Sequence, residues 1–230
     1  MYFELGAETL AKQISHALPG SLKIVSDLQS RPVKSGFRVY VCASHQSFSQ
    51  HIGQPVGSPV RGIAFLSDVW ISPKAFDFQG VDTHASTLTH ELSHLHLVQH
   101  LGWFRKTKNI PAWFFEGLAD WAAGTGDEIV SRRQAINALK GDHHLFPDST
   151  GRLPFPKGAS DYGLSWPMLH SQSRLFVEHL YALDKAAFGN FVTALIAGER
   201  FGPAFSNYFG QNLTDVWHRF LLSLQEPVTL

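Results

Sequence analysis

The sequence is almost free of cysteine. Cys42 is the only cysteine among 230 residues, so the chain forms no internal disulfide bond. Any metal site in it must therefore use histidine and carboxylate ligands instead of thiolates. A lone cysteine is compatible with a reducing compartment without excluding an exported domain.

The chain also lacks net charge and long apolar runs. Nineteen Lys and Arg residues balance 19 Asp and Glu residues, so no overall field recruits nucleic acid or an anionic membrane. No apolar run approaches the ~20 residues of a membrane span, and the first residues lack the basic-then-apolar pattern of a signal peptide. We expect no nucleic-acid partner and no membrane span. The compartment stays open, because a trimmed exported or membrane-anchored protein also fits, and so does the oligomeric state.

Hydrophobic residues make up 44% of the chain and charged residues 17%, which describes a globular protein with a substantial core. We expect a single α+β domain over 1–230, with a small mixed β-sheet and helices in 1–80 and a mainly helical part in 81–230. Short apolar and alternating patterns predict strands at 22–26, 37–43, 61–66 and 69–72. Helical periodicity and capping residues predict helices at 6–18, 44–52, 83–101, 111–123, 128–140, 161–183, 184–198, 202–209 and 213–225.

Two boundaries in this assignment depend on glycine and proline. The first helix is expected to end at Pro19 and Gly20, which are strong helix-breaking signals. The stretch 141–160 is rich in glycine and proline and is expected to be a long loop. Loops of this length in compact domains often serve as functional lids.

The stretch with the clearest chemistry contains the pattern H-E-x-x-H, formed by His90, Glu91 and His94. In an α-helix, residues i and i+4 lie one turn apart on the same face, so both imidazoles can reach one ion. Glu91 lies beside that face, within reach of a water bound to the ion. Three leucines would bury the opposite side of this helix: Leu88, Leu92 and Leu95. A histidine pair on an ordinary helix is the alternative interpretation.

Two histidines leave a zinc site short of the usual three protein ligands plus water. Glu116 can supply the third ligand, and Asp120 lies one helical turn beyond it, where its carboxylate can orient a ligand imidazole. Both acids lie among aromatic residues, and buried carboxylates cost free energy unless they are paired or bind a metal. In the alternative interpretation, both acids face solvent on an amphipathic helix.

The residues 83–121 resemble the gluzincin metallopeptidases, the zinc enzymes that include thermolysin and the zinc aminopeptidases, and the chain is similar in size to the single-domain minigluzincins. The resemblance implies a zincin-like architecture and one Zn²⁺ held by His90, His94 and Glu116. It also implies that Asp120 supports a histidine ligand. No H-x-x-G-x-x-H continuation follows the motif, which argues against the metzincin branch.

Members of this family use a Tyr or His, from the helical part after the third ligand, to stabilise the oxyanion. The stretch 161–180 is similar to that region, and its register places His170 at the donor position, with Tyr162 as the second choice. This resemblance implies that one of these two side chains shares the developing negative charge with the metal.

The resemblance implies hydrolysis of a peptide or protein substrate. Zn²⁺ lowers the pKa of its bound water to about 7, and Glu91 would take that proton and deliver it to the leaving amine. By analogy with the family, the strand at 61–66 would pair with the extended substrate. No motif distinguishes an endopeptidase from an exopeptidase.

Two alternatives use the same residues differently. A non-catalytic metal-binding or regulatory protein could keep this scaffold, with its fourth coordination position filled by protein or by the 141–160 loop. Two histidines and one carboxylate also form the site of non-haem Fe(II) enzymes, although that chemistry does not need an acid directly after the first ligand.

Overall fold

The computed structural model describes residues 1–126, 129–141 and 143–225. Within these residues it contains four strands and ten α-helices, which confirms the α+β class with a small sheet and a mainly helical second part. Contacts along the chain divide it into two compact units, Met1–Gln99 and His100–Leu230. None of the described helices is long and apolar enough to cross a membrane.

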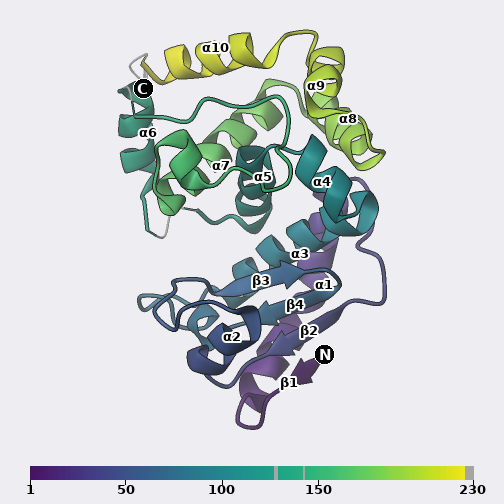
Figure 1. The fold of residues 1–230 in the computed structure, drawn as a ribbon, viewed down its shortest axis with the longest axis vertical. Helices are drawn as coiled ribbons and strands as arrows, with labels where there is room; N and C mark the ends of the chain where they lie inside the picture. The colour runs from purple at the N-terminus through teal and green to yellow at the C-terminus, as the bar shows by residue number, and fades with distance from the viewer. Residues whose placement is uncertain (127–128, 142, 226–230) are drawn as a thin grey trace. The chain divides into compact units, whose positions relative to one another are not determined.

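The first unit is built on a four-stranded mixed sheet (Figure 1). Its strands are β1 (Tyr2–Phe3), β2 (Arg38–Val41), β3 (Gly62–Phe65) and β4 (Asp68–Ile71). The order is β1-β2-β4-β3, in which β1, β2 and β4 are parallel and β3 is antiparallel to β4. β3 is therefore an edge strand. Three of the four expected strands are confirmed: β2 and β3 are narrower than expected, and β4 is shifted by one residue.

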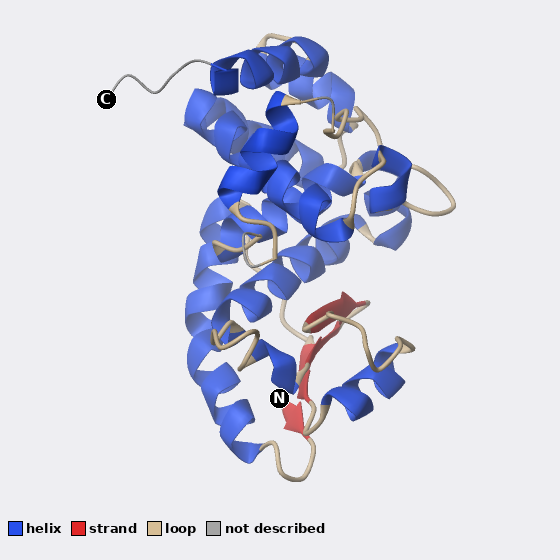
Figure 2. Ribbon diagram, turned by 90° about the vertical axis from the view of Figure 1, so that its left-hand side faces the viewer, coloured by secondary structure: helices blue, strands red, loops and turns tan. Residues whose placement is uncertain are grey.

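Helices cover both faces of this sheet. Figures 1 and 2 show α1 (Glu8–Leu28) and α3 (His84–Leu101) on one face and α2 (His45–Ile52) on the other. Alternate residues of β2 and β4 and one side of each long helix form the core between them. Its larger members are Ile14, Val25, Val39, Val41, Val69, Ile71, Leu88, Leu92 and Leu95. The predicted burial of the three α3 leucines is confirmed.

The expected end of the first helix and the expected strand at 22–26 are both wrong. α1 continues through Pro19 to Leu28 and includes that segment. Its buried positions, Ala11, Ile14, Ser21 and Val25, keep one heptad-like spacing across the proline. A proline inside a helix costs about 3 kcal/mol through a lost hydrogen bond and a steric clash. Burial of the continuous stripe offsets this cost, so tertiary packing overrides the local break signal.

The described part of the second unit contains helices and loops and no strand. Its helices are α4 (Trp103–Asn109), α5 (Ala112–Ala123), α6 (Arg132–Lys140), α7 (Trp166–Leu183), α8 (Lys185–Ile196), α9 (Phe201–Phe209) and α10 (Leu213–Gln225). The sequence did not predict α4, whose polar and basic residues have no clear apolar period. The other helices correspond to predicted segments.

Two of these helices begin later than predicted because their capping residues lie further along the chain. Ser131 caps α6 in a capping box with Gln134, so this helix does not begin at 128, and residues 127–128 are outside the described ones. α7 begins at Trp166, after a 3₁₀ turn over Ala159–Tyr162 that ends at Gly163 in the left-handed conformation. The described residues from 143 to 158 form the expected loop.

An aromatic cluster fixes α5 inside this unit. The rings of Trp113 and Phe176 lie 5.3 Å apart, and those of Phe114 and Phe191 lie 5.6 Å apart. Phe201 contacts both α5 rings, at 5.7 and 5.1 Å. Edge-to-face aromatic pairs add about 0.5–1.5 kcal/mol each beyond their area of burial. The aromatic residues predicted around Glu116 and Asp120 thus anchor α5 to α7, α8 and α9.

α5 and α7 approach each other closely at Gly117. A Cβ placed on Gly117 would lie 2.6 Å from the carbonyl oxygen of Ser173 and 2.7 Å from its carbonyl carbon. Main-chain atoms cannot move aside as a flexible side chain can. Only glycine therefore allows the two helices to approach this closely.

We predict that Gly117→Ala lowers the free energy of unfolding by about 1–3 kcal/mol through overpacking. Gly189→Ala in α8 is the matched control, because no atom lies within 4 Å of a Cβ built there. That change should raise stability by about 0.5–1 kcal/mol, since alanine favours the helix interior. Urea denaturation measures both values. Equal stability of the two variants would contradict the close approach.

Candidate metal centre

Helix α3 carries two imidazoles one turn apart. His90 and His94 lie one helical turn apart, and their ring centroids are separated by 4.5 Å with the ring planes nearly perpendicular. Burial of Leu88, Leu92 and Leu95 against the sheet fixes the rotation of α3 about its axis. The two histidines consequently present their rings on a face of α3 that the sheet does not cover.

Glu91 lies between this face and the edge strand β3. The residue is 7% exposed. A Cβ placed on Gly62 of β3 would lie 2.9 Å from Glu91 Cγ, 3.1 Å from Glu91 Oε1 and 2.9 Å from Thr87 Cγ2. The missing side chain at Gly62 therefore leaves the space that the Glu91 side chain occupies. Sequence reasoning did not identify Gly62, although a glycine within a strand often marks a close approach of this kind.

Helix α5 carries two carboxylates. Glu116 and Asp120 lie one turn apart on this helix, as expected, with side-chain exposures of 17% and 4%. Neither acid is freely exposed to solvent. The aromatic anchors of α5 therefore bury two negative charges side by side, which is costly unless cations or hydrogen-bond donors compensate them.

His170 of α7 contacts both acids. Its Nδ1 lies 2.8 Å from Asp120 Oδ2, and its Nε2 lies 3.7 Å from Glu116 Oε2. The sequence predicted His170 for this region but expected Asp120 to orient a metal-binding histidine. The structure shows Asp120 accepting a hydrogen bond from His170, since α5 and α7 are in close contact at Gly117. That Asp120 orients a metal-binding histidine stays a prediction.

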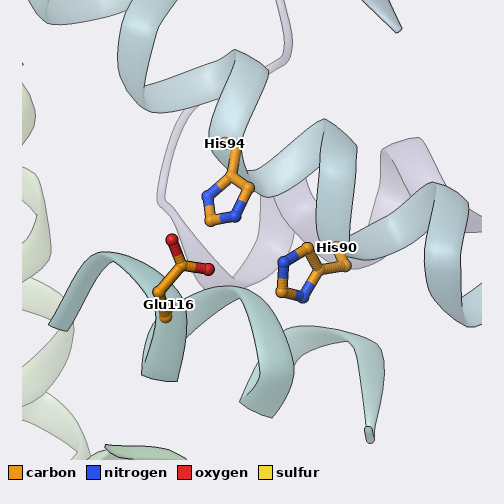
Figure 3. Close-up of side chains that lie close together, drawn as sticks. All are labelled: His90, His94 and Glu116. Atoms are coloured by element: carbon orange, nitrogen blue, oxygen red, sulfur yellow. The ribbon is translucent and has the colours of Figure 1, made fainter. Parts of the chain in front are cut away.

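His90, His94 and Glu116 form one group of side chains that could hold a metal ion. Each offers one ligand atom, and these three atoms all lie within 4.8 Å of one another. Figure 3 shows the two imidazoles and the carboxylate directed toward one another. Among the described residues, one such group is present. Its members are the three residues that the sequence predicted as metal ligands.

The hydroxyl of Tyr162 has a different partner. It donates a hydrogen bond to Asp148 Oδ2 over 2.7 Å. Lys157 Nζ lies 2.6 Å from the other oxygen of the same carboxylate, and Trp113 Nε1 donates to the Asp148 carbonyl oxygen over 3.0 Å. Burial and the neighbouring Asp148 carboxylate raise the pKa of Tyr162. Tyr162 thus helps hold the loop after α6 to the start of α5, whereas His170 contacts Glu116.

Lys106 of α4 is a further cation near Glu116 that the sequence did not reveal. Lys106 is 5% exposed, and its ammonium lies 3.8 Å from the ring centroid of Phe115 and 4.6 Å from that of Trp103. Burial lowers the pKa of Lys106 to about 8, and the Glu116 carboxylate opposes this by raising it. The aromatic faces stabilise the ammonium through cation–π contacts.

Comparison with known proteins adds no relative. The chain matches no model of a protein family, no curated protein and no solved structure. The functional argument therefore depends on the chemistry of the residues themselves.

We predict that the metal-free protein binds one Zn²⁺ per chain. His94→Ala and Glu116→Ala should each weaken binding by more than about 100-fold, because loss of a ligand exceeds the 10–100-fold effect of losing its supporting partner. His84→Ala is the control, since His84 lies on the same helix and contacts Asp82 at 2.6 Å. Calorimetric titration with ZnCl₂ measures both stoichiometry and affinity. Unchanged binding by the His94 and Glu116 variants would exclude this ligand set.

Proposed function

We propose that this protein is a zinc-dependent peptidase of the gluzincin type. The observation that carries the proposal is the group formed by His90, His94 and Glu116, with Glu91 directly after the first histidine. Two imidazoles and one carboxylate are a donor set that catalytic zinc sites use, with the fourth position left for water or substrate. The proposal requires that α3 and α5 present these ligands to the same ion.

Each residue of the H-E-x-x-H pattern then has a defined task. A zinc ion held by the three ligands would supply the Lewis acidity that makes water a nucleophile near neutral pH. The Glu91 carboxylate accepts the proton of the attacking water and returns it to the amine that leaves. Gly62 assists by leaving room for Glu91 beside β3, so the carboxylate is held in one place.

His170 is the side chain best placed to stabilise the oxyanion. Its Nδ1 is hydrogen-bonded to Asp120, which fixes the plane of the ring, and its Nε2 is on the side of Glu116. Nε2 donates a hydrogen bond when the ring carries both protons. In this proposal Asp120 is a positioning residue that acts through His170, and Tyr162 has a structural role beside Asp148.

The edge strand β3 is the proposed backbone-binding element for the substrate. Among the described strands β3 pairs with β4 on one side only, so its other edge can pair with an extended peptide. Main-chain hydrogen bonds of this kind hold many peptides irrespective of their sequence. Because Gly62 of β3 lies against Glu91, a peptide on this edge would pass close to the general base.

The donor set itself favours one second candidate, a non-haem Fe(II) enzyme. That chemistry gives no task to a buried acid next to His90, whereas peptide hydrolysis does. The purified protein should therefore contain zinc, and stoichiometric iron without zinc would support the iron enzyme. A non-catalytic metal-binding protein is the remaining alternative, and hydrolysis of any peptide would exclude it.

We predict that Glu91→Gln keeps one zinc ion per chain and lowers kcat/KM for peptide hydrolysis by about 10²–10⁴-fold, the usual effect of losing general base catalysis. The amide keeps the size of the side chain but cannot accept the proton. A library of fluorogenic peptides measures the rate, and mass spectrometry measures zinc. Glu199→Gln is an exposed control that should behave as wild type. Full activity of the Glu91 variant would disprove this mechanism.

We further predict that Gly62→Ala lowers kcat by about 10–100-fold, because a displacement of about 1 Å at a catalytic group has effects of this size. The added methyl group would overlap Glu91 Cγ and Thr87 Cγ2, each 2.9 Å from the new Cβ. Zinc content should stay at one ion. Gly57→Ala is the matched control, since no atom lies within 4 Å of its Cβ position. Equal kcat values for both variants would show that Gly62 does not position Glu91.

A further inference from the structure

An exposed tryptophan adjoins the proposed oxyanion donor. Trp166 is the first residue of α7 and is 53% exposed. It precedes His170 by one helical turn, and the two ring centroids lie 5.9 Å apart at an interplanar angle of 64°. The indole therefore lies on the same side of α7 as the histidine that contacts Glu116 and Asp120.

The loop before α7 supports this indole from another side. A Cβ placed on Gly158 would lie 3.7 Å from Trp166 Cζ2, so the Gly158 backbone is close to the ring. The Gly158 amide donates to Asp161 Oδ2 over 2.7 Å, and Arg152 contacts both oxygens of Asp161 at 3.0 and 3.3 Å. These bonds close the segment 152–161 into a compact turn. The indole is thus held between Gly158 and His170 while half of its surface stays exposed.

This arrangement offers an apolar surface beside catalytic groups. Water solvates an exposed indole poorly, and burying apolar surface contributes roughly 25 cal/mol per Å². A partner side chain that covers Trp166 would gain this free energy without reorganising the ring, since the ring is already held in place. Phe155, which is 74% exposed in the same turn, adds a second apolar side chain to the segment.

The local charges favour an apolar ligand over a basic one. Asp161 is the acid of the supporting turn, and its carboxylate is already paired with Arg152 and with the Gly158 amide. Asp120, the acid nearest to His170, is bonded to that imidazole. A lysine or arginine side chain placed over the indole would find both of these acids already paired. It would therefore gain no new ion pair with them.

We propose that Trp166 determines substrate specificity by binding a large apolar side chain, such as Phe or Leu, of a residue that flanks the scissile bond. This inference rests on the proposed function, because it assumes that the peptide bond is cleaved next to Glu116 and His170. Trp166 touches the substrate but takes no part in proton transfer.

The test compares peptides that differ only in the residue on one side of the cleaved bond, with Phe, Leu, Ala or Lys at that position, first on one side and then on the other. The wild type should prefer Phe over Ala on one side by about 10–100-fold in kcat/KM, the range that apolar pockets give. Trp166→Ala should reduce this preference to less than about threefold, and Trp166→Phe should keep most of it.

Binding gives a readout that does not depend on turnover. In the Glu91→Gln background, fluorescence anisotropy of a labelled Phe peptide should show weaker binding after Trp166→Ala by the same factor. Leu222→Ala on α10 removes a residue that is 65% exposed and serves as the control for loss of exposed apolar surface. It should change neither preference nor affinity.

The outcomes separate the two proposals. If zinc-loaded wild type cleaves no peptide, the proposed function fails. If the wild type cleaves peptides but Trp166→Ala keeps the preference for Phe, the role of Trp166 is overturned and the proposed peptidase function is retained. The same conclusion follows if the wild type prefers Lys or shows no preference on either side.

Discussion

The close approach of α5 and α7 at Gly117 is the contact on which the acidic part of the candidate site depends. Gly117 follows Glu116 directly, and Ser173, whose main chain it meets, lies less than one turn after His170. A larger residue at Gly117 would separate the two helices. His170 would then lose its position between the carboxylates, 2.8 Å from Asp120 and 3.7 Å from Glu116. The main-chain contact between Gly117 and Ser173 therefore sets the distances between His170 and the two carboxylates.

In the first unit a glycine likewise makes room beside an acidic residue, Glu91. Gly62 in β3 leaves the space occupied by Glu91, as Gly117 leaves the space needed beside Glu116. Gly62 allows the β3 main chain to lie close to Glu91, and Gly117 allows the α7 main chain to lie close to the residue after Glu116. A carboxylate on a long side chain loses about 1.5–2 kcal/mol of rotamer freedom when it is fixed. Close packing against main chain restricts it before any ligand arrives.

The sequence predicted the parts of this protein that local signals control. H-E-x-x-H, the Gly124 end of α5 and the Ser44 cap of α2 are local patterns, and the corresponding helices are present. The end of α1 could not be predicted from the sequence, because the continuation of this helix through Pro19 depends on its burial against the sheet. The Asp120–His170 pair could not be predicted either, since it depends on how closely α5 and α7 approach. The roles proposed for Gly62 and Trp166 also depend on tertiary contacts.

The burial of Glu91 separates the catalytic proposal from a structural one. A metal that only braces α3 needs His90 and His94 but no acid between them. Burying a carboxylate costs several kcal/mol unless partners compensate it. Here the chain keeps the acid at 7% exposure and places a glycine opposite it. Gly62 thus leaves room for a group that a structural metal site does not require, and in the catalytic proposal this group is the general base.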